Sequence, residues 1–126
     1  MYQVATTQGR IDLAQARAGL VPLKHITHIA LGTGGHALDD PSTPVPPTAD
    51  DLALETEIVR KAVSVSMVDS MTVRYSISIA KIEQNGTVFT EAGLFDEGGV
   101  MVARQTFSGK TKEADIIMNF DWDEPF

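Results

Sequence analysis

The sequence predicts an α+β domain: a mostly antiparallel β-sheet of about five strands, with short helices near the N-terminus. Three observations support this class. Apolar and polar residues alternate through most of the second half, as they do in half-buried strands. Helix-forming residues gather in the first twenty positions, and a Gly/Pro-rich segment, residues 32–47, separates the two regions. The chain has 126 residues, 43% of them apolar, which is enough for one hydrophobic core and predicts a single domain over residues 1–126.

The first element is a short helix from about Gln8 to Ala18. Thr6 or Thr7 can accept a backbone N–H as the N-cap, and most of the residues that follow are good helix formers. Gly19 offers a stop, and a proline three residues later prevents the helix from continuing.

A strand is expected next, over residues 25–32, because β-branched residues lead into a glycine cluster. Both faces of this strand mix apolar and polar side chains, so we expect it to be covered on both sides. A second short helix is expected to start near Thr48, with Asp50 and Asp51 beside its positive N-terminus and Leu52 and Leu54 as apolar anchors.

Residues 32–47 predict a protruding arm. The segment contains three glycines and four prolines but few large apolar residues, and proline removes the backbone donors that a sheet needs. It is long for a plain connection. We therefore expect either a mobile arm or an extended segment held by another chain, with Pro41, Pro44, Pro46 and Pro47 as candidate interface residues.

The second half of the sequence predicts strands and turns. Strands are expected over residues 59–67 and 73–80, and Asn85-Gly86 predicts a type I′ hairpin between the second of these strands and the strand that follows. Turns are also expected at residues 96–99 and 108–110. The closing strand places its apolar residues on one face; these are Ile116, Met118, Phe120 and Trp122.

Composition excludes several classes of function. The formal net charge is -7 and no basic stripe is present, which disfavours nucleic-acid and anionic-membrane partners. The chain has no cysteine, so disulfides and thiolate chemistry are excluded. We find no signal peptide and no apolar stretch of the roughly 20 residues that a membrane span requires.

No catalytic, cofactor or metal site is predicted. His25 and His28 would face opposite sides of a strand, so they cannot easily chelate one metal ion together. Residues 32–35 resemble a phosphate-binding loop but lack its lysine and its following helix. Glu91 is the only acid among apolar neighbours, and a lone carboxylate is more often a hydrogen-bonded structural residue. The chain is therefore predicted not to be an enzyme.

Four segments together resemble the tail-collar fibre and related baseplate proteins of tailed phages. The most specific is residues 89–104, which contain Glu-Ala-Gly-Leu-Phe-Asp, then a glycine turn and a short apolar strand. Residues 27–34 resemble that family's segment after the N-terminal helix, residues 52–55 with Arg60-Lys61 its Leu/Glu/Arg element, and residues 112–122 its closing strand. The resemblance spans most of the chain.

The resemblance implies a structural component of a bacteriophage tail that connects the tail or baseplate to fibres by subunit assembly. The implied partners are other tail, baseplate and fibre proteins and copies of the chain itself, as a trimer; the implied location is the virion, assembled in the host cytoplasm. Because the chain stops at Phe126 without a fibre shaft, we expect a stand-alone adaptor. Leu94, Phe95, Trp122 and Phe126 join the four prolines as candidate interface residues.

The rival interpretation is a carbohydrate-binding module that touches the host cell surface. Such a module needs exposed aromatic side chains beside acids, and the sequence has only 1 Trp and 2 Tyr. This scarcity favours the structural interpretation, and a glycan-binding screen would separate the two.

Overall fold

The computed structural model describes all 126 residues and shows a mainly-β protein. It contains one helix and ten strands, and every strand pair is antiparallel. The elements are β1 (Tyr2–Ala5), α1 (Thr7–Arg17), β2 (Ile26–Gly32), β3 (His36–Ala37), β4 (Asp40–Pro44), β5 (Glu57–Ala62), β6 (Ser64–Asp69), β7 (Thr72–Ile79), β8 (Val88–Asp96), β9 (Met101–Thr111) and β10 (Met118–Pro125). The predicted α+β class is therefore wrong.

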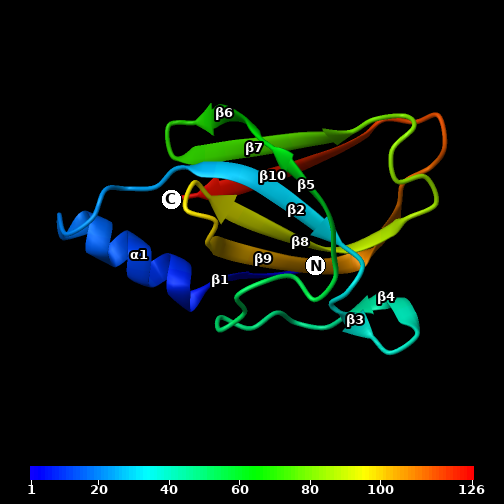
Figure 1. The fold of residues 1–126 in the computed structure, drawn as a ribbon, viewed down its shortest axis with the longest axis horizontal. Helices are drawn as coiled ribbons and strands as arrows, with labels where there is room; N and C mark the ends of the chain where they lie inside the picture. Colours follow the sequence, from blue (N-terminus) through cyan, green and yellow to red (C-terminus); the bar gives the residue numbers. More distant parts are fainter.

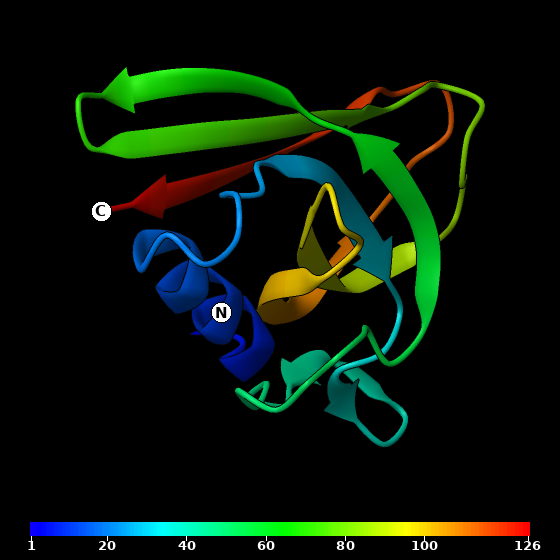
Figure 2. The ribbon, with the colours of Figure 1, turned by 60° about the vertical axis from the view of Figure 1, so that its left-hand side comes forward.

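Two sheets form the body of the molecule (Figure 1). The larger has the strand order β1-β9-β8-β2-β5 and the smaller has the order β10-β7-β6; β3 and β4 form a separate two-stranded hairpin. One bent stretch of chain supplies an edge to both sheets: β5 pairs with β2, and after Val63 the chain continues as β6 beside β7. Figure 2 shows this stretch curving from one sheet to the other.

The core lies between the two sheets. Alternate residues of β7 and β10 point inward, as the period-two pattern predicted, and the closing strand buries Phe120 and Trp122. They meet Ile29, Leu31 and Leu94 from the larger sheet, all fully buried. Burial of this apolar surface, worth about 25 cal/mol per Å², is the main stabilising contribution.

A smaller apolar cluster covers the other side of the larger sheet. Leu54 packs there against Ala30, Phe95 and Met101. The guanidinium of Arg60 lies 3.8 Å from the centre of the Phe95 ring, a cation–π contact. Residues on both faces of β2 and β8 are thus buried by the chain itself.

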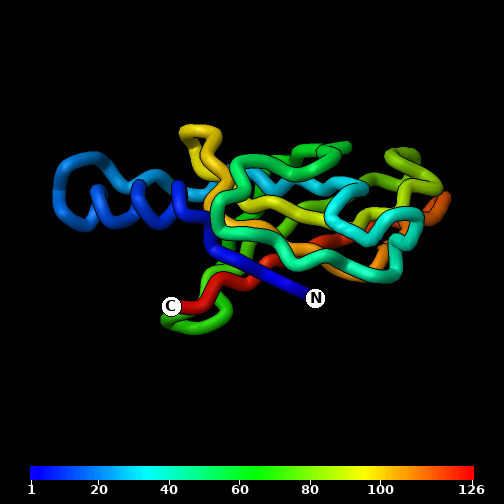
Figure 3. Tube along the Cα trace, turned by 90° about the horizontal axis from the view of Figure 1, so that it is seen from below, coloured from blue at the N-terminus to red at the C-terminus, as the bar shows by residue number.

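The helix α1 begins as predicted. Thr6 is its N-cap, and the Thr6 side chain accepts a hydrogen bond from Gly9 N at 3.1 Å. The helix nevertheless has no buried residue and projects from one end of the molecule (Figure 3). No helix is long and apolar enough to cross a membrane.

The second predicted helix is absent. Asp51 accepts hydrogen bonds from both Thr48 N and Thr48 Oγ1 and also binds Arg104, so local side-chain bonding holds a turn where a helix was expected. The predicted Asn85-Gly86 hairpin is also wrong. β7 and β8 belong to different sheets, and residues 80–87 form a longer crossing between them, in which Gln84 and Gly86 have positive φ angles.

Of the two other predicted turns, one is confirmed. Asp96 Oδ1 accepts hydrogen bonds from Gly98 N and Val100 N, which closes the β8–β9 turn. The turn predicted at 108–110 is wrong, because these residues lie inside β9. A Cβ atom on Gly109 would lie 2.5 Å from Val88 Cγ1, so this glycine serves close packing of two strands.

The segment 32–47 does not protrude as a free arm. It forms the β3–β4 hairpin and then returns along β9, where Val45 N donates to Gly35 O at 2.8 Å and Thr106 Oγ1 donates to Val45 O at 2.8 Å. The four prolines have no backbone N–H, and the bonds that hold this part of the segment come from Val45 N and Thr106 Oγ1 instead.

Candidate functional site

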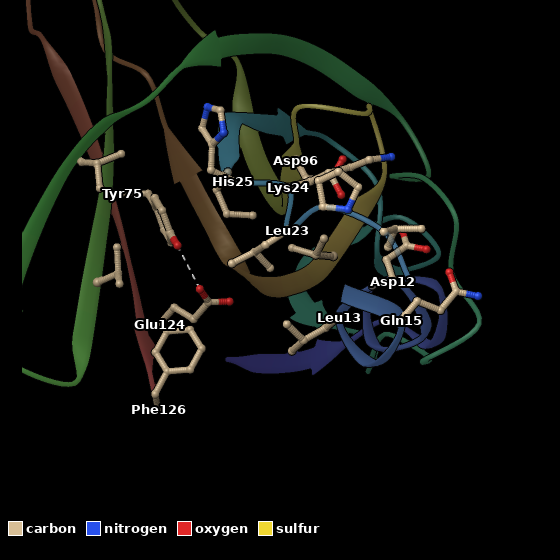
Figure 4. A pocket seen from close by; sticks show the side chains of 17 residues that line it. Asp12, Leu13, Gln15, Leu23, Lys24, His25, Tyr75, Asp96, Glu124 and Phe126 are labelled. Atoms are coloured by element: carbon tan, nitrogen blue, oxygen red, sulfur yellow. Dashed lines mark hydrogen bonds between the residues drawn. The ribbon is translucent and has the colours of Figure 1, made fainter. Parts of the chain in front are cut away.

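An apolar cleft of about 730 Å³ opens at the end of the sandwich where α1 projects (Figure 4). One wall is the inner face of the smaller sheet, whose strands extend past the packed core. The other wall is α1 and the loop that follows it. The cleft is the open mouth of the core, since Ile26 and Val102 lie at its base beside buried residues.

The sheet wall follows from strand alternation. Val73 and Tyr75 share the inner face of β7, Val65 of β6 lies opposite Tyr75, and Phe126 follows the end of β10. Near the middle of the sheet this face is covered by the larger sheet. At the open end nothing covers it, so Val65 is 57% exposed and Phe126 is 74% exposed.

The opposite wall is equally apolar. Leu13 on α1 and Leu23 in the following loop line the cleft, and Figure 4 shows Leu23 projecting into the space between the helix and the smaller sheet. Leu23 is 70% exposed. Scattered exposed apolar residues are normal on protein surfaces, but here several line one concave end, which is an arrangement typical of binding surfaces.

Few polar groups enter the cleft. The Tyr75 hydroxyl donates to Glu124 Oε1 at 2.9 Å, and burial, followed by the Glu124 charge and this hydrogen bond, raises the pKa of Tyr75. Tyr75 therefore remains a neutral donor at all ordinary pH values. Asp12, Lys24 and His25 contribute to the lining.

A second cluster, at the far end of β2, is built around Glu91. This carboxylate is fully buried and accepts four hydrogen bonds, each 2.8 Å long. Oε2 accepts from Gly34 N and Thr56 N, and Oε1 accepts from Glu55 N and Arg104 Nη2. We call these residues, with Asp51, the Glu91 clamp.

Arg104 connects the clamp to a second carboxylate. Its Nη1 donates to Asp51 Oδ2 at 2.8 Å, while its Nε is buried without a partner. Burial acts to raise the pKa of Asp51, but hydrogen bonds from Arg104 and Thr48 outweigh burial and hold that pKa below its ordinary value. Burial likewise acts to lower the pKa of Arg104, and its two carboxylate partners more than reverse this.

The clamp explains the glycine-rich loop at residues 32–35. Its Gly34 N–H does point at an anion, as in a phosphate-binding loop, but the anion is the chain's own Glu91. A Cβ atom on Gly34 would lie 2.7 Å from Glu91 Oε2, so glycine is needed for this close approach. The Glu91 carboxylate holds three segments of the chain together, because each of its two oxygens accepts two hydrogen bonds from within the chain.

Three of the four segments that carry the phage-tail resemblance meet at or beside the clamp. Residues 27–34 supply Gly34, residues 52–55 supply the Glu55 N–H, and residues 89–104 supply both Glu91 and Arg104. The short patterns are thus parts of one packed unit. Gly93, in the most specific of these segments, is also needed for close packing, because a Cβ atom there would lie 2.8 Å from the Phe95 ring and 2.9 Å from Met101 Sδ.

The structure separates the predicted interface residues into two groups. Leu94, Phe95 and Trp122 are 0%, 3% and 1% exposed, so the chain's own core holds them and they offer no surface to a partner. Leu94 packs against residues of the smaller sheet, and Phe95 packs against Leu54. The sequence does not show these contacts, so both residues were predicted to be covered by a partner.

The other predicted interface residues lie at the surface. Phe126 is exposed and lines the cleft. The four prolines lie on or just after the β3–β4 hairpin and are exposed or half-buried; they are Pro41, Pro44, Pro46 and Pro47.

Two features had no signal in the sequence. The cleft arises from strands that overhang the core, and no local pattern marks this. Lys112 is fully buried, and its ammonium donates to Lys81 O, Asn85 Oδ1 and Glu113 O, at 3.2, 2.8 and 2.8 Å. These bonds fix the crossing between β7 and β8.

The histidines do not gather. His28 Nδ1 lies 2.8 Å from Thr27 Oγ1, His36 Nδ1 lies 2.7 Å from Ala37 O, and His25 lies beside Glu97 at 3.4 Å. No group of three or more histidine, aspartate or glutamate side chains is arranged to hold a metal ion.

Comparisons with known proteins return no family. No protein-family model matches the chain, and no curated protein matches it.

Proposed function

We propose that this protein is a structural, non-enzymatic component of a bacteriophage tail, which connects the tail or baseplate to fibres by binding neighbouring subunits. The observation that carries the proposal is the apolar cleft at the open end of a tightly packed sandwich. Leu23, Val65 and Phe126 stand exposed there on walls that the core supports. Such an arrangement suits a protein partner that supplies the missing apolar cover.

The phage-tail assignment itself comes from the sequence resemblance. Its support is that three of the four resembling segments converge on the Glu91 clamp and so belong to one folded unit. The non-enzymatic assignment is supported by the chemistry of Glu91, whose two oxygens are each engaged by two donors. A carboxylate held this way has no free lone pair positioned for proton transfer.

The carbohydrate-binding alternative receives less support. Trp122 and Tyr75 are buried in the core, which leaves Tyr2 and Phe126 as the exposed aromatic side chains. These two residues belong to elements on different sheets, β1 and the end of β10, whereas a sugar platform needs rings on one shallow surface. A glycan-array screen of the purified protein is the direct test, and strong selective binding would favour this alternative.

The main test is genetic complementation in a phage that carries this gene. The gene is disrupted, and complementation is attempted with the natural sequence, with Leu23→Asp and with Leu38→Asp. Leu23 lines the cleft, whereas Leu38 is 92% exposed in the β3–β4 turn and is the matched control.

We expect disruption to yield particles without attached fibres in electron micrographs. The natural sequence and Leu38→Asp should restore fibres, and Leu23→Asp should not. Normal fibred particles after disruption would refute the proposed function. Full rescue by Leu23→Asp would show that the cleft is not the attachment surface.

A further inference from the structure

The edge strand β6 is exposed along its whole length. All six residues from Ser64 to Asp69 are exposed, and β7 is the only strand that pairs with β6. The strand contains no proline and no charge before Asp69. Val65 and Met67 are 57% and 58% exposed on its inner face. An open edge of this kind is a template for another strand.

The other sheet edges carry the usual protection. β5 and β10 have charged side chains, and β10 also ends in a proline; β1 is only four residues long. Charge, proline and shortness are the common devices that prevent edge-to-edge pairing. The stretch from Ser64 to Met67 in β6 carries none of these devices, since the one charge of the strand, Asp69, and its one irregularity in pairing both lie after Met67. The protective residues are Glu57, Arg60 and Lys61 on β5 and Asp121, Asp123, Glu124 and Pro125 on β10.

The surface area of the chain is consistent with a missing contact. A folded monomer of this mass, 13.6 kDa, is expected to expose about 6,600 Å². The chain exposes 7172 Å², an excess of roughly 600 Å². A standard protein interface buries about 800 Å² on each partner, so the excess is of the right order for one interface.

The β6 sequence is complementary to itself in one antiparallel register. We propose that β6 pairs with β6 of a second copy about a two-fold axis at Ser66, joining the two smaller sheets into one six-stranded sheet. Val65 then lies opposite Met67 of the second copy, and Met67 opposite the second copy's Val65. The four apolar side chains share the inner face, where cross-strand apolar pairs stabilise a sheet.

The same register leaves polar groups on the wet face. Ser66 meets Ser66 of the second copy there, beside Arg74 of its own chain. No like charges face one another directly across this strand pair, so the repulsion between two chains of net charge -7 acts only at longer range, where salt screens it. Sliding the register by one residue would turn Val65 and Met67 to the outer face of the neighbouring sheet, which disfavours that alternative.

This inference goes beyond the proposed function and does not depend on a phage-tail role. It predicts an isologous dimer, because a two-fold axis relates identical patches. The trimer implied by the resemblance would need a different, heterologous contact. Solution mass therefore separates the two outcomes.

The absence of cysteine makes cross-linking a clean test. In the proposed register the two Ser66 residues are directly opposite, within reach of a disulfide. The two Ser64 residues are about four positions apart along the strands, roughly 13 Å, which is too far. Oxidation of Ser66→Cys should therefore give a covalent dimer within minutes, and oxidation of Ser64→Cys should not.

The second measurement is sedimentation equilibrium of the unmodified protein from about 1 to 100 μM, with Ser66→Lys and Ser78→Lys as a matched pair. Ser66→Lys places two ammonium groups face to face at the axis, whereas Ser78 is exposed on the same wet face, away from the edge.

We expect twice the 13.6 kDa chain mass for the natural protein and for Ser78→Lys, and at least a tenfold weaker association for Ser66→Lys. Circular dichroism checks that every variant is folded. A natural protein that is monomeric at 100 μM, a trimer, or equal cross-linking at positions 64 and 66 would overturn the proposal.

Discussion

Replacement of Glu91 by glutamine tests whether the clamp stabilises the fold. The substitution keeps the side-chain shape but replaces one oxygen with an NH₂ group. Either oxygen position faces two donors: Gly34 N and Thr56 N at one, Glu55 N and Arg104 Nη2 at the other. The amide therefore confronts two N–H groups in either orientation, and Arg104 loses one of its two counter-charges.

The expected cost follows from burial. Breaking a buried ion pair by neutralising one partner typically costs about 3–5 kcal/mol, because an uncompensated charge and unpaired donors remain in the interior. The unfolding entropy of a 126-residue chain is roughly 0.26 kcal/mol/K, so the melting temperature should fall by about 10–20 °C. A domain of this size has about 5–15 kcal/mol of stability in total, and the variant should fold but be clearly weakened.

The measurement is urea unfolding followed by circular dichroism at pH 7. The matched control is Glu57→Gln, the same chemical change in a surface pair whose two side chains are 38% and 35% exposed. That pair, with Arg60, should contribute less than about 1 kcal/mol. If Glu91→Gln costs no more than Glu57→Gln, with equal m-values, the clamp does not stabilise the fold and the reasoning is refuted.

Three further predictions concern single side chains. The folded-state pKa of Asp51 is lowered, so its stabilising contribution is complete above the unfolded-state pKa and is lost as pH falls through the folded-state pKa. Urea unfolding at pH 7 and pH 3 should therefore show a smaller loss of unfolding free energy on acidification for Asp51→Asn than for the natural protein. The exposed control Asp39→Asn should lose as much as the natural protein. Lys112→Met removes the three hydrogen bonds that the buried Lys112 ammonium donates and should lower the free energy of unfolding by about 1–3 kcal/mol, whereas Lys110→Met on the exposed part of β9 should leave it unchanged within error. Gly93→Ala forces Phe95 and Met101 apart and should cost about 1–3 kcal/mol by thermal unfolding; a neutral result would mean that the two side chains relax freely.

Some local signals in the sequence predicted the local structure correctly. The N-cap at Thr6 and the Asp96 turn are set by side-chain hydrogen bonds to nearby backbone, which short patterns encode. The alternation over 73–80 correctly gave the inner and outer faces of β7, because strand period is a property of neighbouring residues.

The errors arose where distant segments decide the outcome. Asn85-Gly86 is strong hairpin chemistry, yet the strands on either side belong to different sheets, and a turn motif cannot specify which strands will pair. Gly109 looked like a turn residue but serves a close contact with Val88, and a single glycine is compatible with either. The α+β assignment failed because ten strands form instead of about five, and because the turn at Asp51 has the composition of a helix start.

The Glu91 clamp and the cleft also depend on contacts between distant segments, which the sequence does not show. Glu91 could be singled out as a lone acid among apolar neighbours, but its donors lie 57, 35 and 36 residues away as backbone N–H groups of Gly34, Thr56 and Glu55. Backbone donors leave no residue-type signature. The cleft depends on how far β6 and β7 overhang the core, which only the assembled sheets determine.

The clamp and the cleft lie at opposite ends of β2: Ile26 lines the cleft, and Gly32 pairs with Glu91 at the clamp. Six residues of strand separate the two points by about 20 Å, far enough for substitutions to act independently. Leu23→Asp should leave the free energy of unfolding unchanged in both the natural and the Glu91→Gln background, since Leu23 is 70% exposed. A coupling above about 0.5 kcal/mol in the double variant, measured by urea unfolding, would contradict this independence and show that the cleft walls contribute to the fold.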